Sequence, residues 1–402
     1  MKQKLIFVID SLKVGGAEKS LITFLSVLDY QRFEVDLQLF SYGGAYERFL
    51  PEEVRLLPPL LLMQFLQKTI KEHILSFHIN FLWARFRYSL AIRKKDIRHV
   101  DRARLYWAYF SQFIKKCDMC YDAAIAYGQN LPTLYVADKV QAKVKFAWVN
   151  VSYNPKGVNH KYFESFYSKF DYIVTVSPSA KEAFLNTYPY FQHKTTIIRD
   201  MYDGKTIERM SLDDCPIHLD ETVPSIVTMA RLKREQKGYD ISLETCRLLK
   251  ERGLKFCWYA LGEGPYRGEM EHYIKEHHLE DYFILLGALS NPYPVLRQCM
   301  LYVQTSRYEG FGLSIAEARI LNKPVVTTEF EAVYAQMVPG ENGLVVSQDP
   351  VAVADAIERL LNNATLYQHI VDYQKQEKKS NTEEIEKFYR LVENSYEKIS
   401  SI

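Results

Sequence analysis

Two glutamates eight residues apart are the residues of this chain best suited to bind a polar, charged ligand. They bound the sequence Glu309-Gly310-Phe311-Gly312-Leu313-Ser314-Ile315-Ala316-Glu317, which follows an apolar run and opens a predicted helix. Gly310 and Gly312 let the backbone approach a ligand closely. The free N–H groups at the helix start, near Gly312 and Leu313, favour an anion such as a diphosphate.

Each of these glutamates suits one part of a sugar nucleotide. Glu317 lies about one turn into the helix among small apolar residues, where a carboxylate is costly unless it meets a partner such as a ribose diol. Glu309 precedes the helix and can accept hydrogen bonds from sugar hydroxyls. The alternative is a capped structural helix that carries a surface glutamate.

Two further loops contain groups that bind phosphate. The sequence from Arg231 to Gly238 follows an apolar run, and its cations, Arg231 and Lys237, can neutralise a diphosphate leaving group. A solvated basic loop is the alternative interpretation. Gly15 and Gly16 can expose backbone N–H groups to a phosphate, but their spacing is not that of a dinucleotide-binding loop.

The elements that must position these loops alternate between apolar strands and amphipathic helices. Runs typical of buried parallel strands occur at residues 5–9, 35–40, 54–57, 123–127, 144–149, 172–176, 196–198, 226–230, 256–261, 283–286, 301–304 and 325–327. The rhythm lapses between Asp203 and Pro224, where we expect a linker. The pattern predicts an α/β protein with two Rossmann-like domains that face a central cleft, at residues 1–205 and 206–380, and a tail helix at 381–402.

Composition favours a protein that stays in the cytoplasm. The six cysteines are scattered, which is typical of a reducing compartment. The first apolar run is too short for a signal peptide, and no uncharged run reaches the ~20 residues of a spanning helix. Cys117 and Cys120 have no second pair at metal-binding spacing, so we expect no metal there.

Residues 60–116 differ from the rest of the chain in charge. They contain twelve Lys and Arg against three acidic residues, a net charge of +9, together with many aromatic residues. Basic helices with an aromatic face lie in the interface of anionic membranes. The alternative is two helices that bury their aromatic residues in the first domain. No recognition motif indicates a nucleic-acid partner.

Taken together, these motifs resemble those of the retaining GT-B glycosyltransferases of family 4, in particular the capsular and exopolysaccharide enzymes of bacteria. The resemblance covers nearly the whole chain and is strongest from Ile226 to Val346. It rests on the order of the glycine loop at Gly15, the pair Arg231 and Lys237, the sequence Gly262-Glu263-Gly264-Pro265 and the Glu309/Glu317 motif.

The resemblance implies a role for each candidate residue. Arg231 and Lys237 would hold the donor diphosphate, Glu317 the ribose and Glu309 the transferred sugar. The backbone at Ala288 and Leu289 would read the base. The remaining donor-binding positions would be Gly15, Gly16, Gly262 and the amides of Phe311, Gly312 and Leu313. Such enzymes need no metal or other cofactor, keep the anomeric configuration and use no protein nucleophile. Their tail helix packs on the first domain.

The resemblance also implies partners: a nucleotide-sugar, with uridine expected before guanosine, and an acceptor on a polyprenyl diphosphate at the inner face of the membrane. Asn150 stands where many family members have a histidine; it can hydrogen-bond a sugar hydroxyl, or simply end a strand. Asp200 replaces a more usual asparagine. Two alternatives remain, a non-catalytic nucleotide-sugar-binding partner of a polysaccharide assembly complex and a nucleotide-sugar 2-epimerase.

Overall fold

The computed structural model describes residues 2–60, 79–93, 99–150, 159–215 and 217–400, and the chain forms two compact units. The first unit comprises Met1–Lys13, Ala17–Arg199 and Glu383–Ile402, and the second comprises Val14–Gly16 and Asp200–Thr382. Each unit contains one sheet in which all strand pairs are parallel. The predicted α/β fold with two parallel sheets is therefore confirmed.

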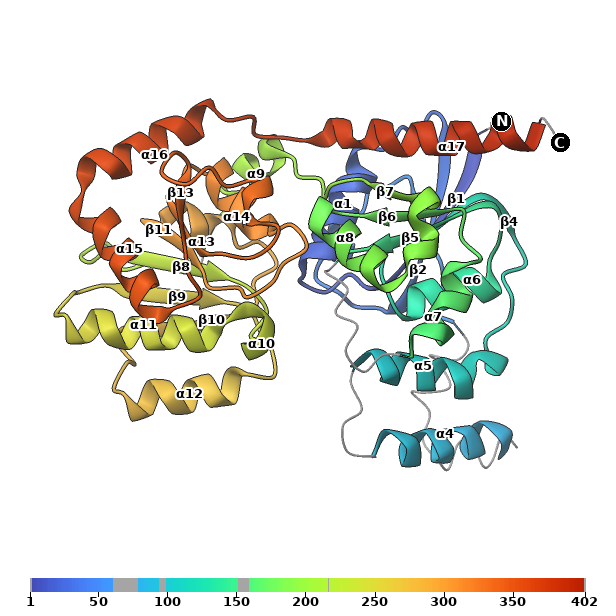
Figure 1. The fold of residues 1–402 in the computed structure, drawn as a ribbon, viewed down its shortest axis with the longest axis horizontal. Helices are drawn as coiled ribbons and strands as arrows, with labels where there is room; N and C mark the ends of the chain where they lie inside the picture. The colour runs from blue at the N-terminus through green and yellow to red at the C-terminus, as the bar shows by residue number, and fades with distance from the viewer. Residues whose placement is uncertain (1, 61–78, 94–98, 151–158, 216, 401–402) are drawn as a thin grey trace. The chain divides into compact units, whose positions relative to one another are not determined.

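The sheet of the first unit has seven strands in the order β3-β2-β1-β4-β5-β6-β7 (Figure 1). Its strands are β1 (Gln3–Ser11), β2 (Phe33–Ser41), β3 (Val54–Leu56), β4 (Cys120–Ala126), β5 (Gln141–Val149), β6 (Tyr172–Thr175) and β7 (Thr195–Ile197). Its helices are α1 (Gly16–Val27), α4 (Ile79–Ile92), α5 (His99–Phe110), α6 (Leu131–Lys139), α7 (His160–Tyr167), α8 (Pro178–Thr187) and α17 (Ile385–Ser400).

Both faces of this first sheet are covered, because its strands are apolar on both sides. On one face, residues of β1, β4 and β5 share a core with side chains from α4 to α8. On the other face, Phe388 of α17 lies with its ring centroid 5.1 Å from that of Phe24 and 5.4 Å from that of Phe146. Tyr389 stacks on Phe33, so the last helix packs on the sheet at which the chain begins.

The sheet of the second unit has six strands in the order β10-β9-β8-β11-β12-β13. They are β8 (Ser225–Met229), β9 (Cys257–Leu261), β10 (Phe283–Gly287), β11 (Leu301–Gln304), β12 (Val325–Thr328) and β13 (Gly343–Val346). One face packs against α11 (Tyr239–Glu251), α12 (Arg267–Glu276), α15 (Pro350–Asn362) and α16 (Ala364–Gln376). The other face packs against α9 (Gly204–Met210), α13 (Tyr293–Gln298), α14 (Leu313–Ile320) and the short η4 (Val333–Ala335).

The stretch expected to be a linker, from Asp203 to Pro224, differs from that expectation. It begins with helix α9, whose N-terminus is capped by Asp203 through hydrogen bonds from the backbone N–H groups of Lys205 and Thr206. Ile207 and Leu219 belong to the core of the second unit. The two units divide at Asp200, before the boundary expected at residue 205.

The helices of the described ranges fall short of what a membrane span requires in length and hydropathy. None of them is both long enough and apolar enough to cross a bilayer.

Candidate functional site

The strand order of the second sheet reverses between β8 and β11, which are neighbours although β9 and β10 lie between them in sequence. Loops that leave the carboxyl ends of two such strands diverge, and ligands of open parallel sheets bind at this place. The segment after β8 contains Arg231 and, at the end of the short helix α10 (Arg234–Lys237), Lys237; the loop after β11 contains Glu309. Residues expected to bind a diphosphate and a sugar therefore meet at one edge of the sheet.

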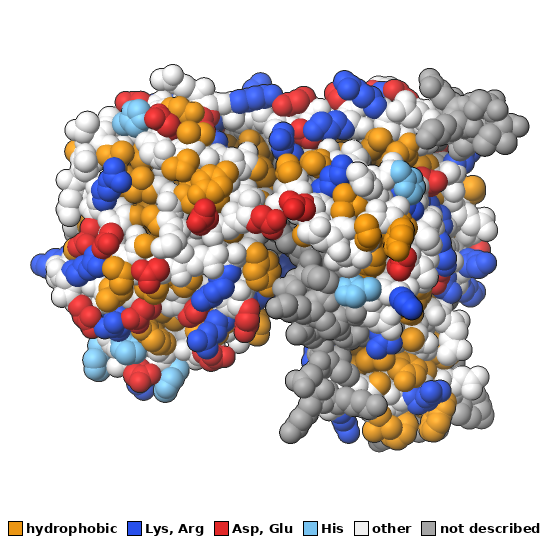
Figure 2. Space-filling model, in the orientation of Figure 1, with side chains coloured by type: hydrophobic (Ala, Val, Ile, Leu, Met, Phe, Trp, Pro, Cys, Tyr) orange, Lys and Arg blue, Asp and Glu red, His pale blue; other side chains and the backbone are white. Residues whose placement is uncertain are grey.

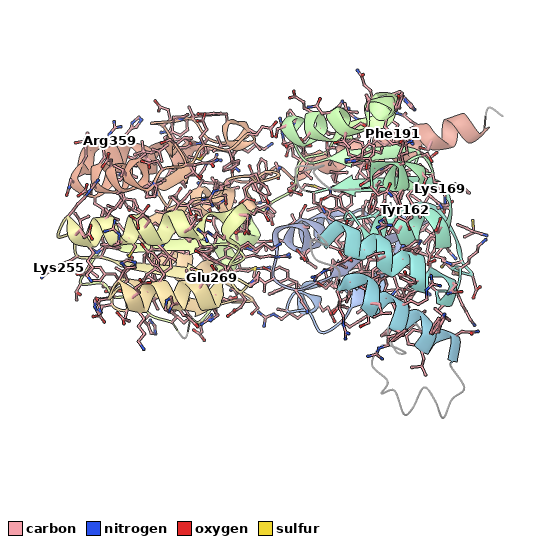
Figure 3. All side chains as sticks on the ribbon, turned by 60° about the horizontal axis from the view of Figure 1, so that its bottom comes forward. Tyr162, Lys169, Phe191, Lys255, Glu269 and Arg359 are labelled. Carbon is pink, nitrogen blue, oxygen red and sulfur yellow. The ribbon has the colours of Figure 1, made fainter. Side chains whose placement is uncertain are left out.

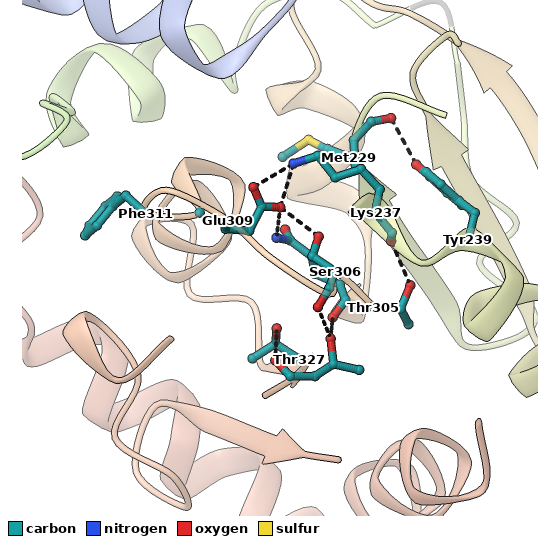
Figure 4. Close-up of polar contacts among 12 residues, drawn as sticks. Met229, Lys237, Tyr239, Thr305, Ser306, Glu309, Phe311 and Thr327 are labelled. Atoms are coloured by element: carbon teal, nitrogen blue, oxygen red, sulfur yellow. Dashed lines mark hydrogen bonds and ion pairs between the residues drawn. The ribbon is translucent and has the colours of Figure 1, made fainter. Parts of the chain in front are cut away.

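Lys237 and Glu309 form an ion pair at this edge, in which the ammonium contacts both carboxylate oxygens (Figure 4). The Lys237 Nζ lies 2.6 Å from Glu309 Oε1 and 2.7 Å from Oε2. Oε1 also accepts hydrogen bonds from Gln304 Nε2 at 2.8 Å and from Ser306 Oγ at 2.7 Å. The Glu309 carboxylate is only 8% exposed, so these donors compensate its burial.

The two oxygens of Glu309 are not equivalent. Three donors converge on Oε1, whereas Lys237 is the donor recorded for Oε2 among the described residues. A carboxylate oxygen has two lone pairs, so Oε1 is saturated and Oε2 keeps acceptor capacity. This arrangement suits Glu309 to accept a hydrogen bond from a ligand hydroxyl through one defined atom.

A glycine brings Lys237 into place. Gly238 has φ +61°, and a Cβ at this position would lie 2.0 Å from the carbonyl oxygen of Thr305. The Thr305 hydroxyl in turn donates to the Gly238 carbonyl at 2.9 Å. Only glycine permits both the left-handed turn and this close contact, which fixes the loop after β8 against the end of β11.

Two further cations of this segment, Arg231 and Lys233, lie near Lys237, whereas Arg234 pairs with Asp240 and Glu269. Arg231 is exposed, and Lys233 is half-buried. Burial lowers the pKa of the Lys233 ammonium, and the nearby positive charges of Arg231 and Lys237 lower it further. Three cations therefore lie close together beside the buried Glu309 carboxylate. The excess of positive charge favours an anionic ligand.

The glycines of the sequence from Gly262 to Pro265 pack against this cationic loop. A Cβ at Gly262 would lie 1.9 Å from the carbonyl oxygen of Ala230, and one at Gly264 would lie 2.3 Å from that of Leu232. The N–H of Gly262 donates to the carbonyl of Gly287, directly before Ala288 and Leu289. Ala288 is exposed, whereas Leu289 packs against the core, so these two residues adjoin the loop but differ in accessibility.

Helix α14 begins at the second glycine of the Glu309/Glu317 motif. Gly312 adopts φ +88°, a left-handed conformation that favours glycine. The Gln336 side-chain amide donates to the carbonyls of Phe311 and Gly312, at 2.5 and 3.1 Å. Phe311 and Leu313 bury their side chains, so their contribution to a ligand would come from the backbone.

Glu317, the second acid of the motif, has a protein partner on helix α13. Its Oε1 accepts a hydrogen bond from the Tyr293 hydroxyl at 3.0 Å, and the residue is 3% exposed. Nothing in the sequence pointed to this tyrosine, which lies 24 residues earlier on α13. A ribose diol would therefore join an existing hydrogen bond rather than supply the first partner.

The remaining candidates, Asn150, Gly15 and Gly16, lie on other elements. Asn150 follows β5 in the first unit and donates from Nδ2 to the carbonyl of Tyr127 at 3.3 Å. Its Oδ1 is buried, and no partner for it is found among the described residues. Gly16 is the first residue of α1, directly after Gly15.

Sequence reasoning missed Gln304 and Ser306. Both are buried and both donate to Glu309. The signal that could have revealed them is polarity, since Gln304 ends an otherwise apolar strand and Ser306 follows it closely. A buried polar side chain nearly always has a hydrogen-bond partner, and here the partner is the carboxylate of Glu309.

Comparison with known proteins places these features in a family. Residues 223–363 match the family model described as "Glycosyl transferases group 1", and this range contains the Lys237–Glu309 pair and Glu317. The matches to three curated relatives span only 27–42% of those relatives' lengths. One of them is the alpha-D-kanosaminyltransferase of Streptomyces kanamyceticus, 29% identical over 41% of this chain and 41% of its own length.

A longer match is found with a Campylobacter jejuni protein. It is the N-acetylgalactosamine-N,N'-diacetylbacillosaminyl-diphospho-undecaprenol 4-alpha-N-acetylgalactosaminyltransferase, 27% identical over 86% of this chain and 87% of its own length. This alignment reaches far outside the region of the family model, so the similarity is not confined to the second unit.

Solved structures share the whole fold. A mutant of TarM from S. aureus, in complex with Fondaparinux, alpha-GlcNAc-glycerol and UDP, has a TM-score of 0.66 at 16% identity and covers 97% of this chain and 99% of its own. Anabaena HepE in complex with UDP has a TM-score of 0.63 at 16% identity, over 99% of this chain and 100% of its own. The chain thus contains a glycosyl transferases group 1 domain at residues 223–363 and shares the GT-B fold of these solved structures.

Proposed function

We propose that this chain is a retaining, metal-independent glycosyltransferase of family 4 that transfers a sugar from a UDP-sugar to a lipid-linked acceptor in bacterial polysaccharide synthesis. The observation that carries the proposal is the pairing of Lys237 with Glu309 beside the start of α14, at the strand-order reversal of the group 1 domain. This edge offers a positive region for a diphosphate and an acceptor atom for a sugar hydroxyl.

The proposed donor contacts follow from the site. Arg231 and Lys237 counter the diphosphate charge, with the N–H groups at the start of α14 as further donors. Glu309 binds the transferred sugar through Oε2, and Glu317 with Tyr293 binds the ribose. UDP in the complexes of the similar TarM and HepE structures supports uridine as the base.

In the proposed reaction, the bond between the anomeric carbon and the diphosphate oxygen breaks while the acceptor oxygen bonds to the same face of the sugar. The acceptor proton passes to the departing diphosphate, so no protein base or nucleophile is required. Stabilising the developing charge on that diphosphate is the main task of the enzyme, and cations fixed in advance do this without reorganising.

A lipid-linked acceptor is supported by the Campylobacter relative, whose name includes a diphospho-undecaprenol substrate. An enzyme for such an acceptor works at a membrane surface, and α4 offers a suitable face. Trp83, Phe86 and Leu90 recur at helical spacing and are 60%, 53% and 49% exposed. Figure 2 shows hydrophobic side chains gathered on this helix next to Lys and Arg side chains.

Helix α4 has an apolar side that is exposed and an apolar side that is buried. The Trp83 and Phe86 rings stack on each other 5.7 Å apart, while Phe81 and Ala84 on the opposite side enter the core. Arg87 lies among the exposed residues and Arg93 directly follows the helix. An aromatic stripe flanked by cations fits the interface of an anionic bilayer. Lys94 and Lys95, which contribute to the charge of this region, lie outside the described residues.

The experiment that tests the proposal begins with a thermal-shift panel of UDP-, GDP- and ADP-sugars, because a ligand that binds only the folded state raises its melting temperature. The donor found is then incubated with polyprenyl-diphosphate sugars in the presence of EDTA, and the product is analysed by mass spectrometry and by NMR of its anomeric proton. Sugar transfer with retained configuration is expected. A UDP-sugar that binds but is never consumed would instead support a non-catalytic binding partner, the alternative that Asn150 in place of a histidine raises.

A further inference from the structure

Gln304 is a fully buried amide that lies between two other polar side chains of the second unit. It ends β11, is 2% exposed, and bridges Tyr302 on one side and Glu309 on the other. The Tyr302 hydroxyl donates to Gln304 Oε1 at 2.7 Å, and Gln304 Nε2 donates to Glu309 Oε1 at 2.8 Å. The three side chains form one directed chain of hydrogen bonds that ends on the proposed sugar-binding carboxylate.

The direction of this chain is fixed by the Glu309 carboxylate, which can only accept. It agrees with the shorter of the two contacts of the Tyr302 hydroxyl, 2.7 Å to Gln304 Oε1 against 3.5 Å to the carbonyl oxygen of Met229. Tyr302 is fully buried, and burial raises the pKa of its hydroxyl well above the usual value, so the group stays a donor at neutral pH. A hydroxyl that donates to Gln304 requires the amide oxygen on its side. The amide nitrogen must then face Glu309, where the carboxylate accepts it.

We propose that Gln304 is a positioning residue for sugar recognition, which together with Lys237 and Ser306 holds the Glu309 carboxylate so that Oε2 meets a hydroxyl of the transferred sugar in one orientation. The inference rests on the proposed function and adds to it a residue that acts only through Glu309. Without the Gln304 donor, Lys237 and Ser306 still occupy Oε1, but the carboxylate loses one of the contacts that hold its plane and can rotate about its side-chain bonds. The sugar would then meet Oε2 in several orientations instead of one.

Three variants distinguish the hydrogen bond that Gln304 donates from the volume that its side chain fills. Gln304→Met keeps a similar volume but removes the donor, and Gln304→Glu keeps the acceptor for Tyr302 but points a carboxylate at Glu309. Tyr302→Phe removes the hydroxyl that fixes the amide. Gln374→Met is the matched control, because Gln374 is an equally buried glutamine of this unit that donates to the backbone carbonyls of Lys323 and Asn342.

The measurement is calorimetric titration with UDP and with the intact UDP-sugar identified in the panel, alongside the melting temperature. For Gln304→Met we expect about ten-fold weaker binding of the UDP-sugar, the typical effect of losing a hydrogen bond to a charged group, with UDP binding unchanged. Gln304→Glu should weaken UDP-sugar binding more than Gln304→Met does, and Tyr302→Phe should weaken it less. The double variant of Tyr302→Phe and Gln304→Met should be no worse than Gln304→Met alone. Gln374→Met should change only the melting temperature.

The inference is wrong if Gln304→Met weakens UDP and UDP-sugar binding equally, or neither, while the protein remains folded. The inference is also wrong if the effects of Tyr302→Phe and Gln304→Met on the free energy of UDP-sugar binding add up in the double variant. A wild-type protein that binds UDP but no UDP-sugar, or that binds neither, would overturn the proposed function and this inference together. Normal wild-type transfer combined with unchanged sugar selectivity in Gln304→Met would overturn the inference alone.

Discussion

The carboxyl edge of the second sheet and the exposed face of α4 are built in opposite ways. At the sheet edge, charged groups are buried and matched to defined partners, as in the Lys237–Glu309 pair. On α4, the large side chains are apolar and exposed, and Trp83 and Phe86 contact each other at the surface. The first region holds its polar groups in one defined geometry, whereas the second presents apolar area at the surface.

This contrast separates two kinds of information in the sequence. A polar site depends on single residues at fixed spacing, because a carboxylate displaced by about 1 Å loses its donors. An interfacial helix depends on composition and periodicity, and many sequences satisfy it. Substitutions should therefore have large, residue-specific effects at the sheet edge and small, cumulative effects on α4.

The largest effects are expected for the cations of the sheet edge. Arg231→Ala and Lys237→Ala should each reduce turnover by about 10²–10³, because each removes a donor to the charge that develops on the leaving diphosphate. The checks are initial rates of UDP release and the melting temperature. Lys255→Ala is the control, since Lys255 is an exposed lysine of the same unit that lies far out on its surface (Figure 3). Unchanged turnover in both site variants would rule out the diphosphate contact.

A smaller effect is expected for the aromatic residues of α4. Trp83→Ser combined with Phe86→Ser should weaken binding to anionic liposomes by about ten-fold or more, because two apolar side chains no longer enter the interface. Cosedimentation measures this, with Tyr190→Ser as control, since Tyr190 is 77% exposed on another part of the first unit. Donor binding should not change. Self-association of the wild type without lipid would point to a second copy of the chain as the occupant of this face.

The smallest effect is expected for the cations beside this face. Arg87→Ser and Arg93→Ser should each weaken liposome binding by about 1 kcal/mol at low salt, and the difference should vanish as salt screens the surface charge. A salt series of cosedimentation assays separates this contribution from that of the aromatic residues, which salt does not weaken. Equal losses at all salt concentrations would mean that these arginines act through packing, for which Arg87 has a partner in the Tyr109 ring.

Much of the fold can be predicted, because most strands are continuous apolar runs bounded by turns. Strand β13 escapes prediction, since a four-residue strand that begins with a glycine carries no periodicity that distinguishes it from a loop. Helix α9 is hidden in the predicted linker because the turn-like residues after it obscure a seven-residue helix capped by Asp203.

Within the site, residue types can be predicted but their pairing cannot. The sequence singles out Glu309 and Lys237 separately, yet their contact depends on a left-handed turn at Gly238 that meets Thr305, 67 residues later in the sequence. The role of a single polar residue on an apolar element can be inferred only when its partner is known. The sequence does not show that Tyr293 contacts Glu317 or that Gln304 contacts Glu309, so both residues are missed.

The central claim is that the two glutamates of one motif bind different parts of one donor. Calorimetric titration of Glu309→Gln and Glu317→Gln with UDP and with the intact UDP-sugar tests it most directly. The account predicts that Glu309→Gln weakens binding of the UDP-sugar while leaving UDP binding nearly unchanged, and that Glu317→Gln weakens both ligands alike. Identical behaviour of the two variants toward both ligands would contradict it.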